Sequence, residues 1–387
     1  MTNDDLVARA RAVAETIAPL ADRIEDDRRL PAEAVRALSD AGAFKMLVPR
    51  AYGGSEASLV TFVRALEEVA RADGSAGWIA MIGATSGLMA AYLDAPVARE
   101  IYSPDDAVTS GVFAPMGRAE RVDGGFKVSG RWSFASGCEH SPWRMGGALV
   151  MGAAGPETLP TGTPDVVSML FRADETKVID TWSTSGLRGT GSHDLEVKDV
   201  FVPASRSFSL FRGAPRPEHE GALYRLPFFG VLAAGVAAVA LGIARHAIDA
   251  VTTLAKAKHP LGAKRGLAHR ELVQLQIARA EAKYRGARAF LLEASTDAEA
   301  EVVTAKQGSL TTRALLRLAA SHATTEAAAA VDLAYETGGG TSIYSKSPLQ
   351  RCFRDVHVAT QHIMVSPTAT TLAGRILLGL ESDTSTL

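Results

Sequence analysis

The sequence contains few cysteines and almost no excess charge. Its 387 residues include two cysteines, Cys138 and Cys352, too few for a disulfide framework or a four-thiolate metal site. With 41 Lys and Arg against 43 Asp and Glu, the net charge of −2 lacks the basic signature of a nucleic-acid-binding protein. No basic segment followed by an apolar run opens the chain, so no secretory signal is predicted. These absences favour a cytoplasmic protein without a nucleic-acid partner.

One long uncharged segment resembles a membrane span. Residues 226–244 carry no charged side chain, and this length is sufficient to cross a bilayer. Many of these residues are Ala or Gly, and the helical pattern continues beyond them to about residue 257. A helix buried by neighbouring helices is therefore predicted, and no membrane partner.

The spacing of apolar residues divides the chain into three parts. Residues 1–106 show helical periodicity, residues 107–215 form short alternating strands, and residues 216–387 are helical again. The Asp-Gly-Gly sequence at 123–125 predicts a β-hairpin. We therefore expect an N-terminal helical domain, a middle β domain with ligand-binding loops and a C-terminal helical domain.

Four long helices are predicted in the last part of the chain. They are expected at about 228–257, 269–296, 299–335 and 349–380, with breaks at Gly262, at 296–299 and at 338–348. Long helices rich in Ala and Leu commonly pack as an antiparallel bundle. The predicted fold class is therefore α+β and multidomain, with a C-terminal four-helix bundle.

The common nucleotide-binding and catalytic motifs are absent. The sequence has no P-loop, HExxH, CxxC or GxSxG motif. The GLRGTG sequence at 186–191 has the wrong glycine spacing for a dinucleotide-binding loop and lies between predicted strands. His357 and His362 are five residues apart, a poor spacing for two metal ligands on one helix face. No metal is expected.

Two polar, glycine-rich loops of the β domain form the candidate ligand site. One runs from Trp132 to Gly137 (WSFASG) and the other from Trp182 to Asp194 (WSTSGLRGTGSHD). Glycines allow a close backbone approach, Ser and Thr provide short hydrogen-bonding groups, and Trp and Phe provide flat faces. This mixture suits a planar heteroaromatic ring. The alternative is that both loops are ordinary turns between strands.

Five sequence blocks resemble the acyl-CoA dehydrogenase superfamily across essentially the whole chain. In order, they are AGAFKMLVPRAYGG, GRWSFASG, GLRGTGSHDLEVKDVFVP, LGIARHAIDA and GGGTSIYSKSPLQRCFRDVHVATQH. The resemblance implies the same order of domains, with a flavin between the β domain and the bundle. It also implies a homo-oligomer, either a dimer or a tetramer.

The resemblance leaves two chemistries open, which differ in their catalytic base. Dehydrogenases of this family usually carry a glutamate a few residues after the C-terminal Arg-Asp, and here that position falls on or beside Ile363. A minority carry it at the start of the first bundle helix, yet residues 222–248 contain no acidic residue. His362 stands nearby instead. Together with WSFASG, the RDxxxxxxH pattern resembles the oxygenase components of two-component flavin-dependent monooxygenases, such as 4-hydroxyphenylacetate hydroxylase and dibenzothiophene monooxygenase.

This second resemblance implies an activity, a cofactor and partners. A separate NAD(P)H:flavin reductase would supply FADH2 or FMNH2, which would react with O2 to form a C4a-(hydro)peroxyflavin. That species would hydroxylate a small aromatic or heteroaromatic substrate, for example an indole-like or polycyclic molecule. Two alternatives stay open: an acyl-thioester dehydrogenase with an atypically placed base, and a catalytically silent flavin-binding or interaction protein.

The resemblance also implies roles for individual residues. His362 and Ser136 are the predicted catalytic residues: His362 would act near the flavin C4a atom as an acid, a base or a peroxide-stabilising group, and Ser136 would bond the N5 edge. Arg265 and Arg270 would reach a flavin phosphate within the chain or from a neighbouring subunit. The full set of predicted cofactor-binding residues is Trp132, Phe134, Ala135, Ser136, Trp182, Thr190, Gly191, Ser192, Arg265, Arg270, Gly338 and Gly339.

Overall fold

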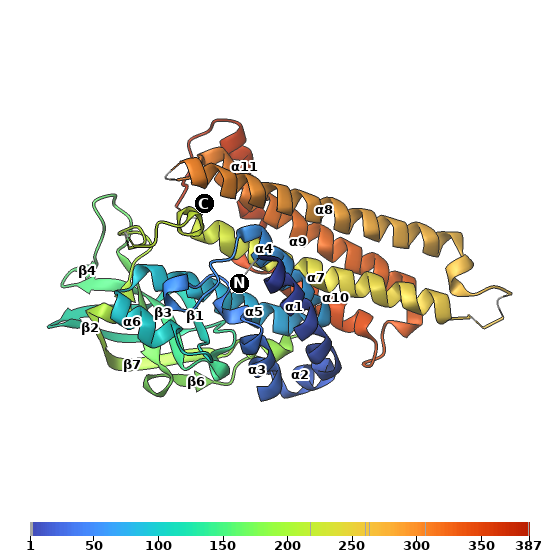
Figure 1. Ribbon diagram of the computed structural model, residues 1–387, viewed down its shortest axis with the longest axis horizontal. Helices are drawn as coiled ribbons and strands as arrows, with labels where there is room; N and C mark the ends of the chain where they lie inside the picture. The colour runs from blue at the N-terminus through green and yellow to red at the C-terminus, as the bar shows by residue number, and fades with distance from the viewer. Residues whose placement is uncertain (1–2, 217, 260, 263, 306, 386) are drawn as a thin grey trace.

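Helices form both ends of the chain and a β-sheet forms its middle. The computed structural model describes residues 3–216, 218–259, 261–262, 264–305, 307–385 and 387. The sheet lies at one end of the molecule, the long C-terminal helices extend to the other, and the N-terminal helices lie against both (Figure 1). Elements distant in the sequence therefore meet where the sheet joins the bundle.

The N-terminal helices contribute one almost completely buried helix to this junction. That helix, α5, follows Asp73, whose carboxylate caps it by accepting a hydrogen bond from the Ala76 amide at 2.9 Å. Its small residues allow close packing, since a side chain at Gly77 would overlap Ala70 on the preceding helix. The N-terminal helices are α1 (Asn3–Ile17), α2 (Ala21–Asp27), α3 (Ala32–Asp40), α4 (Leu59–Ala72), α5 (Gly74–Gly87) and α6 (Ala95–Tyr102).

The eight-stranded sheet has the order β6-β7-β2-β1-β3-β5-β8, with β4 paired to β3. The predicted hairpin is confirmed, because Val122 pairs with Gly125 and Gly124 adopts a φ of 75°. Trp132, at the end of β2, pairs with Leu195 near the start of β7, so the two glycine-rich loops leave the sheet side by side. The strands are β1 (Thr109–Val122), β2 (Gly125–Trp132), β3 (Trp143–Gly152), β4 (Gly155–Pro156), β5 (Val166–Arg172), β6 (Lys177–Ile179), β7 (Asp194–Pro203) and β8 (Ser207–Phe208).

The long uncharged segment is a core helix of the bundle. It belongs to α7, whose most apolar stretch is 83% buried inside the protein, as predicted from its many Ala and Gly residues. Helices α4, α5, α9 and α10 pack around it. The C-terminal helices are α7 (Phe228–Ala257), α8 (Glu271–Thr304), α9 (Leu310–Gly338), α10 (Pro348–Ala359) and α11 (Pro367–Leu377).

Two predicted helix boundaries are wrong. Helix α8 continues through residues 296–299. Within it, the hydroxyls of Ser295 and Thr296 bond carbonyls one turn earlier, at 2.7 and 2.8 Å, so these residues are accommodated inside the helix. The break falls later, where Ser309 caps α9. The helix expected over 349–380 is two helices, interrupted before Pro367 by a short turn that begins at His362. This interruption places His362 at the junction with the sheet.

Candidate active site

Three hydroxyl groups from the two glycine-rich loops form a buried row, called the hydroxyl chain below. Ser136 Oγ lies 2.7 Å from Ser192 Oγ, which in turn lies 2.7 Å from Thr190 Oγ1. A backbone hydrogen bond from the Gly137 amide to the Thr190 carbonyl, at 2.9 Å, joins the same two loops. All three side chains are buried. The structure thus unites three predicted site residues in one hydrogen-bonded unit.

Trp78 on α5 connects the hydroxyl chain to the C-terminal helices. Its indole Nε1 donates a hydrogen bond to Ser136 Oγ at 3.1 Å, and its ring packs edge-on against the imidazole of His362, with centroids 5.5 Å apart. Ser136 and His362 therefore share a site through a residue that sequence reasoning missed. The only local signal is an indole in a helix of mostly small, buried residues, and the same pattern is typical of a core residue.

The geometry holds His362 as a neutral hydrogen-bond donor. Its Nδ1 accepts a hydrogen bond from the Met364 amide at 3.3 Å, which leaves the hydrogen of the neutral ring on Nε2. Burial, reinforced by the nearby guanidinium of Arg317, lowers the pKa of His362 to about 4. At neutral pH the ring is therefore uncharged and donates through Nε2.

Arg317 on α9 supports the turn that carries His362. Its buried guanidinium donates to the Met364 carbonyl at 2.9 Å. Both the amide and the carbonyl of Met364 are therefore hydrogen-bonded, which fixes the turn. Burial lowers the pKa of Arg317 to about 10, which leaves it a cation at neutral pH. This fixed positive charge disfavours a second positive charge on His362.

Phe134 presents a flat apolar face beside the hydroxyl chain. Its side chain is 70% exposed, and its φ of 69° lies in the left-handed region that is unusual for a residue other than glycine. Trp182 approaches it edge-on, with ring centroids 6.1 Å apart, and is fixed by a hydrogen bond from its indole to the Leu187 carbonyl at 3.0 Å. A strained backbone that exposes an aromatic ring next to a buried polar row indicates a place for a planar ligand.

These features fit the ring system of a flavin, which combines a flat face with hydrogen-bonding atoms along its edge. Phe134 offers a surface on which such a ring can stack, and Ser136 Oγ offers a hydrogen-bonding atom beside it. Of the predicted site residues, the structure brings together Phe134, Ala135, Ser136, Trp182, Thr190, Gly191, Ser192 and His362.

Trp132 does not join this group, because it lies in the core of the sheet. Its side chain is 1% exposed, and its indole donates to the Gly147 carbonyl at 2.7 Å. Side chains at Gly117, Gly130 or Gly146 would overlap its ring, so these glycines allow neighbouring strands to enclose it. The ring has no free face for a cofactor.

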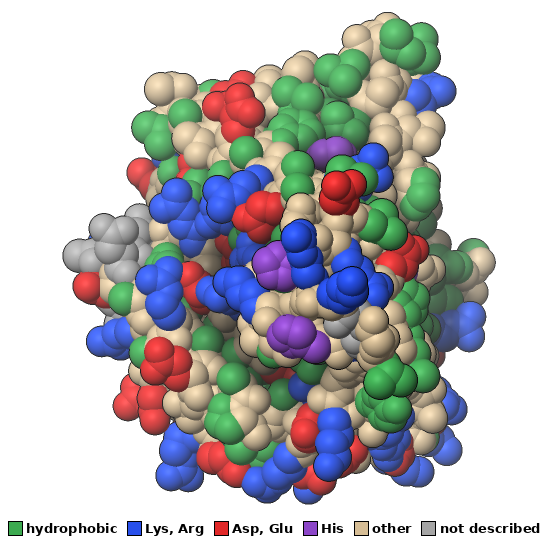
Figure 2. Space-filling model, turned by 90° about the vertical axis from the view of Figure 1, so that its right-hand side faces the viewer, with side chains coloured by type: hydrophobic (Ala, Val, Ile, Leu, Met, Phe, Trp, Pro, Cys, Tyr) green, Lys and Arg blue, Asp and Glu red, His purple; other side chains and the backbone are tan. Residues whose placement is uncertain are grey.

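The other four predicted cofactor-binding residues lie at the far end of the bundle. Gly338 and Gly339 end α9, and Arg265 and Arg270 belong to the connection between α7 and α8, at the end away from the sheet (Figure 1). Lys258 joins the two segments by donating to the Gly338 carbonyl at 3.2 Å. Figure 2 shows Lys, Arg and His side chains gathered on this end of the molecule. Within this molecule, these residues do not reach the hydroxyl chain.

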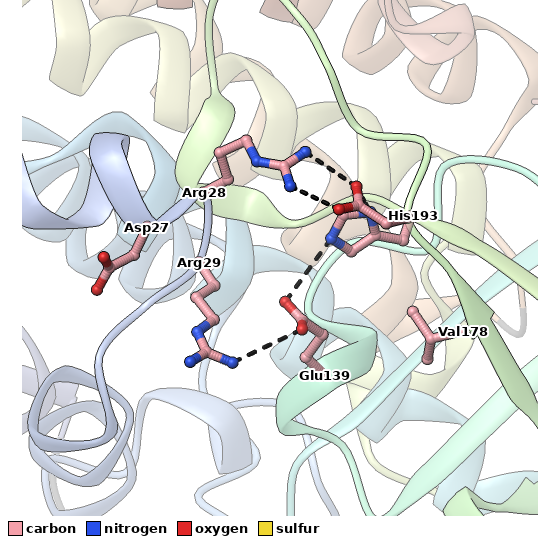
Figure 3. A pocket seen from close by; sticks show the side chains of 7 residues that line it. Asp27, Arg28, Arg29, Glu139, Val178 and His193 are labelled. Carbon is pink, nitrogen blue, oxygen red and sulfur yellow. Dashed lines mark hydrogen bonds and ion pairs between the residues drawn. The ribbon is translucent and has the colours of Figure 1, made fainter.

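A polar cavity of about 400 Å³ lies behind the second loop (Figure 3). Four of its charged groups pair with one another: Arg28 with Asp180 at 2.6 Å, and Arg29 with Glu139 at 3.8 Å. His193, also in its wall, accepts a hydrogen bond on Nδ1 from the amide of Trp182 at 3.2 Å. Pockets for aromatic molecules are predominantly apolar. The polar groups in the wall of this cavity therefore hold the loop that carries Trp182, and the cavity is unsuited to an aromatic molecule.

The other residues considered for metal binding or thiol chemistry, His357 and Cys138, have surroundings that indicate a structural role. Within the described residues, no group of three or more His, Cys, Asp or Glu side chains is arranged to hold a metal ion. His357 bonds Asp332 at 2.9 Å on the bundle. Burial raises the pKa of the Cys138 thiol to about 11, so this cysteine is a poor nucleophile.

Comparisons with known proteins lead to the same fold and chemistry. Residues 3–96 match the model of the acyl-CoA dehydrogenase N-terminal domain, and residues 234–367 match that of the acyl-CoA dehydrogenase C-terminal domain. An indole-3-acetate monooxygenase of Pseudomonas putida is 35% identical, over 91% of this chain and 88% of its own. The oxygenase component of an FADH2-dependent resorcinol hydroxylase of Rhizobium sp. is 31% identical, over 97% of this chain and 94% of its own.

A solved structure extends the similarity to the whole fold. The crystal structure of 3-HSA hydroxylase from Rhodococcus sp. RHA1 superposes with a TM-score of 0.91 at 28% identity, covering 99% of each chain. Both relatives exceed 30% identity over most of their own length, and both names state an oxygenase activity. The chain therefore belongs to the acyl-CoA dehydrogenase superfamily and, within it, to the oxygenase components of two-component flavin-dependent monooxygenases.

Proposed function

We propose that this oxygenase component hydroxylates a small aromatic or heteroaromatic molecule, with a flavin held at the hydroxyl chain. The observation that carries the proposal is the neutral His362, joined through Trp78 to Ser136, in the region where a dehydrogenase requires a carboxylate. Removal of the α-proton of an acyl thioester needs such a base, and residues 222–248 and position 363 provide none. The names of the relatives that act on indole-3-acetate and resorcinol support an aromatic substrate.

The residues of the site divide the work of holding and orienting. When bound, reduced flavin supplies the two electrons with which one atom of O2 enters the substrate and the other becomes water. Phe134 and Trp182 would hold the plane of the ring, and Ser136 would bond its N5 edge. The Nε2–H of His362 would donate a hydrogen bond to the reacting oxygen. Burial of the hydroxyl chain limits water, which would otherwise divert the reaction to hydrogen peroxide.

Oxygen incorporation tests this proposal directly. Protein mixed with an NAD(P)H:flavin reductase, flavin and 18O2 should place one 18O atom in an aromatic product when indole-3-acetate, resorcinol and related rings are supplied as a panel. Oxidised flavin should also reappear more slowly with the protein than in free solution, because the site shields the reacting oxygen. Reappearance at the free-solution rate, together with bleaching of bound oxidised flavin by an acyl-CoA, would instead establish a dehydrogenase.

The proposal includes a homo-oligomer, a dimer or a tetramer, in which the bundle end of one subunit meets the flavin phosphate of another. Arg265 and Arg270 are exposed and lie far from the hydroxyl chain of their own subunit. The sequence from residue 250 to residue 270 contains no Asp or Glu; the nearest acidic residue before it is Asp249. A purely basic loop of this kind suits an anionic group such as a phosphate.

Removal of these two charges should weaken flavin binding. The Arg265→Ala, Arg270→Ala double variant should raise the Kd of reduced flavin about 10-fold, the equivalent of one or two lost charge-assisted hydrogen bonds. Anaerobic titration measures the Kd, and Arg11→Ala, on the exposed surface of α1, is the matched control. An unchanged Kd in the double variant would exclude the bundle end from the phosphate site.

A further inference from the structure

The hydrogen bonds of the hydroxyl chain run in one direction, which is set at the Leu187 end. Thr190 Oγ1 lies 2.8 Å from the Leu187 carbonyl oxygen, which has no hydrogen to donate. The single hydroxyl hydrogen of Thr190 must therefore point to this oxygen, since two acceptors this close would otherwise repel each other. The peptide of Leu187 is held in place by its own amide, which donates to Asp355 Oδ1 at 2.6 Å.

Each further hydroxyl along the row then has one possible role. The hydroxyl hydrogen of Thr190 is already donated to the Leu187 carbonyl, so Ser192 must donate to Thr190 across their 2.7 Å contact. The hydrogen of Ser192 is then donated to Thr190, so Ser136 must donate to Ser192 across the second 2.7 Å contact. The direction imposed by one backbone carbonyl is thus transmitted through two hydroxyls to Ser136.

At the other end of the row, Ser136 is left able only to accept. A hydroxyl has one hydrogen and two lone pairs. The hydrogen of Ser136 is committed to Ser192, and one lone pair accepts the indole N–H of Trp78 at 3.1 Å. One lone pair remains. A ligand atom that meets Ser136 Oγ must therefore bring its own hydrogen to form a hydrogen bond.

We propose that this direction makes the site selective for the redox state of the flavin. N5 of a reduced flavin carries a hydrogen, whereas N5 of an oxidised flavin presents a lone pair. The inference rests on the proposed function, which places Ser136 at the N5 edge. Ser136 accepts a hydrogen bond from N5–H of the reduced ring, and it meets the oxidised ring lone pair to lone pair. Trp78, Ser192 and Thr190 act through Ser136 and are positioning residues.

Ser192→Ala tests the direction, because it removes the acceptor to which the Ser136 hydrogen is committed. In this variant the freed hydrogen can point to N5 of the oxidised ring. We expect the ratio of the two Kd values, oxidised over reduced, to fall about 10-fold, mainly through tighter binding of oxidised flavin. For a two-electron couple, the same 10-fold change raises or lowers the midpoint potential of the bound flavin by about 30 mV, here toward lower potential.

Thr190→Val is a second test that keeps the shape of the side chain. Loss of its hydroxyl lets Ser192 reverse and donate to Ser136, which again frees the hydrogen of Ser136, so the ratio should fall in the same direction. The matched control is Ser141→Ala in the neighbouring turn. Ser141 is an equally buried serine, and its hydroxyl bonds the Gly137 carbonyl at 3.0 Å outside the hydroxyl chain. Its loss should leave the ratio unchanged.

Ser136→Ala separates failure of this inference from failure of the proposed site. If Ser136→Ala changes neither Kd, Ser136 does not face the flavin, and both the placement and the inference fall. If Ser136→Ala weakens reduced flavin but Ser192→Ala and Thr190→Val keep the wild-type ratio within twofold, the placement stands and the direction of the row does not select the redox state. All Kd values are measured anaerobically with FMN and FAD, by ultrafiltration of each redox state, and need no turnover.

Discussion

Replacement of His362 by alanine should lower the rate of aromatic hydroxylation about 100-fold, since loss of one preorganised hydrogen-bond donor commonly lowers kcat by about 10²–10³. The reduced flavin should instead produce hydrogen peroxide, because no other group of this turn replaces the Nε2–H hydrogen-bond donor. The loss should be equal at pH 6, 7 and 8, since the pKa of His362 is held at about 4 and the ring stays neutral over this range. Product formed per reduced flavin oxidised, measured at the three pH values, checks both statements.

His357→Ala is the matched control for this experiment. His357 is five residues earlier, half-exposed and bonded to Asp332, away from Trp78. Its loss should leave hydroxylation unchanged. Two results would contradict the role given to His362: wild-type yield in His362→Ala, or a wild-type activity that titrates near pH 6.5 and loses this step in the variant. The second result would identify the imidazolium as the active form.

Asp355→Ala should lower the free energy of unfolding by about 2–4 kcal/mol, the sum of an unpaired buried amide and a cavity. Asp355 is buried on α10 and accepts the Leu187 amide at 2.6 Å, so it ties the bundle to the loop of the hydroxyl chain. Leu187 itself has a φ of 48°, a conformation that needs such support. Urea unfolding at constant pH measures the loss, with Asp26→Asn on the exposed side of α2 as the control. A loss below 1 kcal/mol would refute the anchoring role.

Asp355→Asn should change the pH dependence of stability instead. Burial, with the nearby carboxylate of Asp73, raises the pKa of Asp355 to about 7 against the opposing hydrogen bond from Leu187. A carboxyl group with a higher pKa in the folded protein takes up a proton on folding. Its contribution to stability is therefore fully present below about pH 4 and is lost as the pH rises to about 7, by at most about 1.4 kcal/mol per pH unit.

Asparagine still accepts the Leu187 amide but does not titrate. The wild type should therefore lose stability relative to Asp355→Asn as the pH rises from 5 to 7, and the difference should level off between pH 7 and 8. Urea unfolding of both proteins across this range measures the difference. A constant difference from pH 5 to 8 would show that Asp355 is ionised throughout.

Local patterns predicted the architecture because the forces that produce it are local. Apolar spacing located the helices and strands, the Asp-Gly-Gly sequence located the hairpin at Val122 and Gly125, and the Ala-rich composition of α7 indicated a core helix. The helix ends were predicted less well. Ser295 and Thr296 can bond either the preceding turn of a helix or a new turn, and only packing decides between the two.

The sequence by itself determined the domain order, the family resemblance, and the presence of His362 where a dehydrogenase would carry a carboxylate; the catalytic roles of Ser136 and His362 stay predictions. Tertiary structure alone decided that Trp78 joins Ser136 to His362, that Trp132 lies in the sheet core, and that Arg265 and Arg270 lie at the opposite end of the molecule. It also decided the protonation of His362 and the direction of the hydroxyl chain. The physical reason is that a pKa and the direction of a hydrogen bond depend on burial and on neighbours brought from distant parts of the chain.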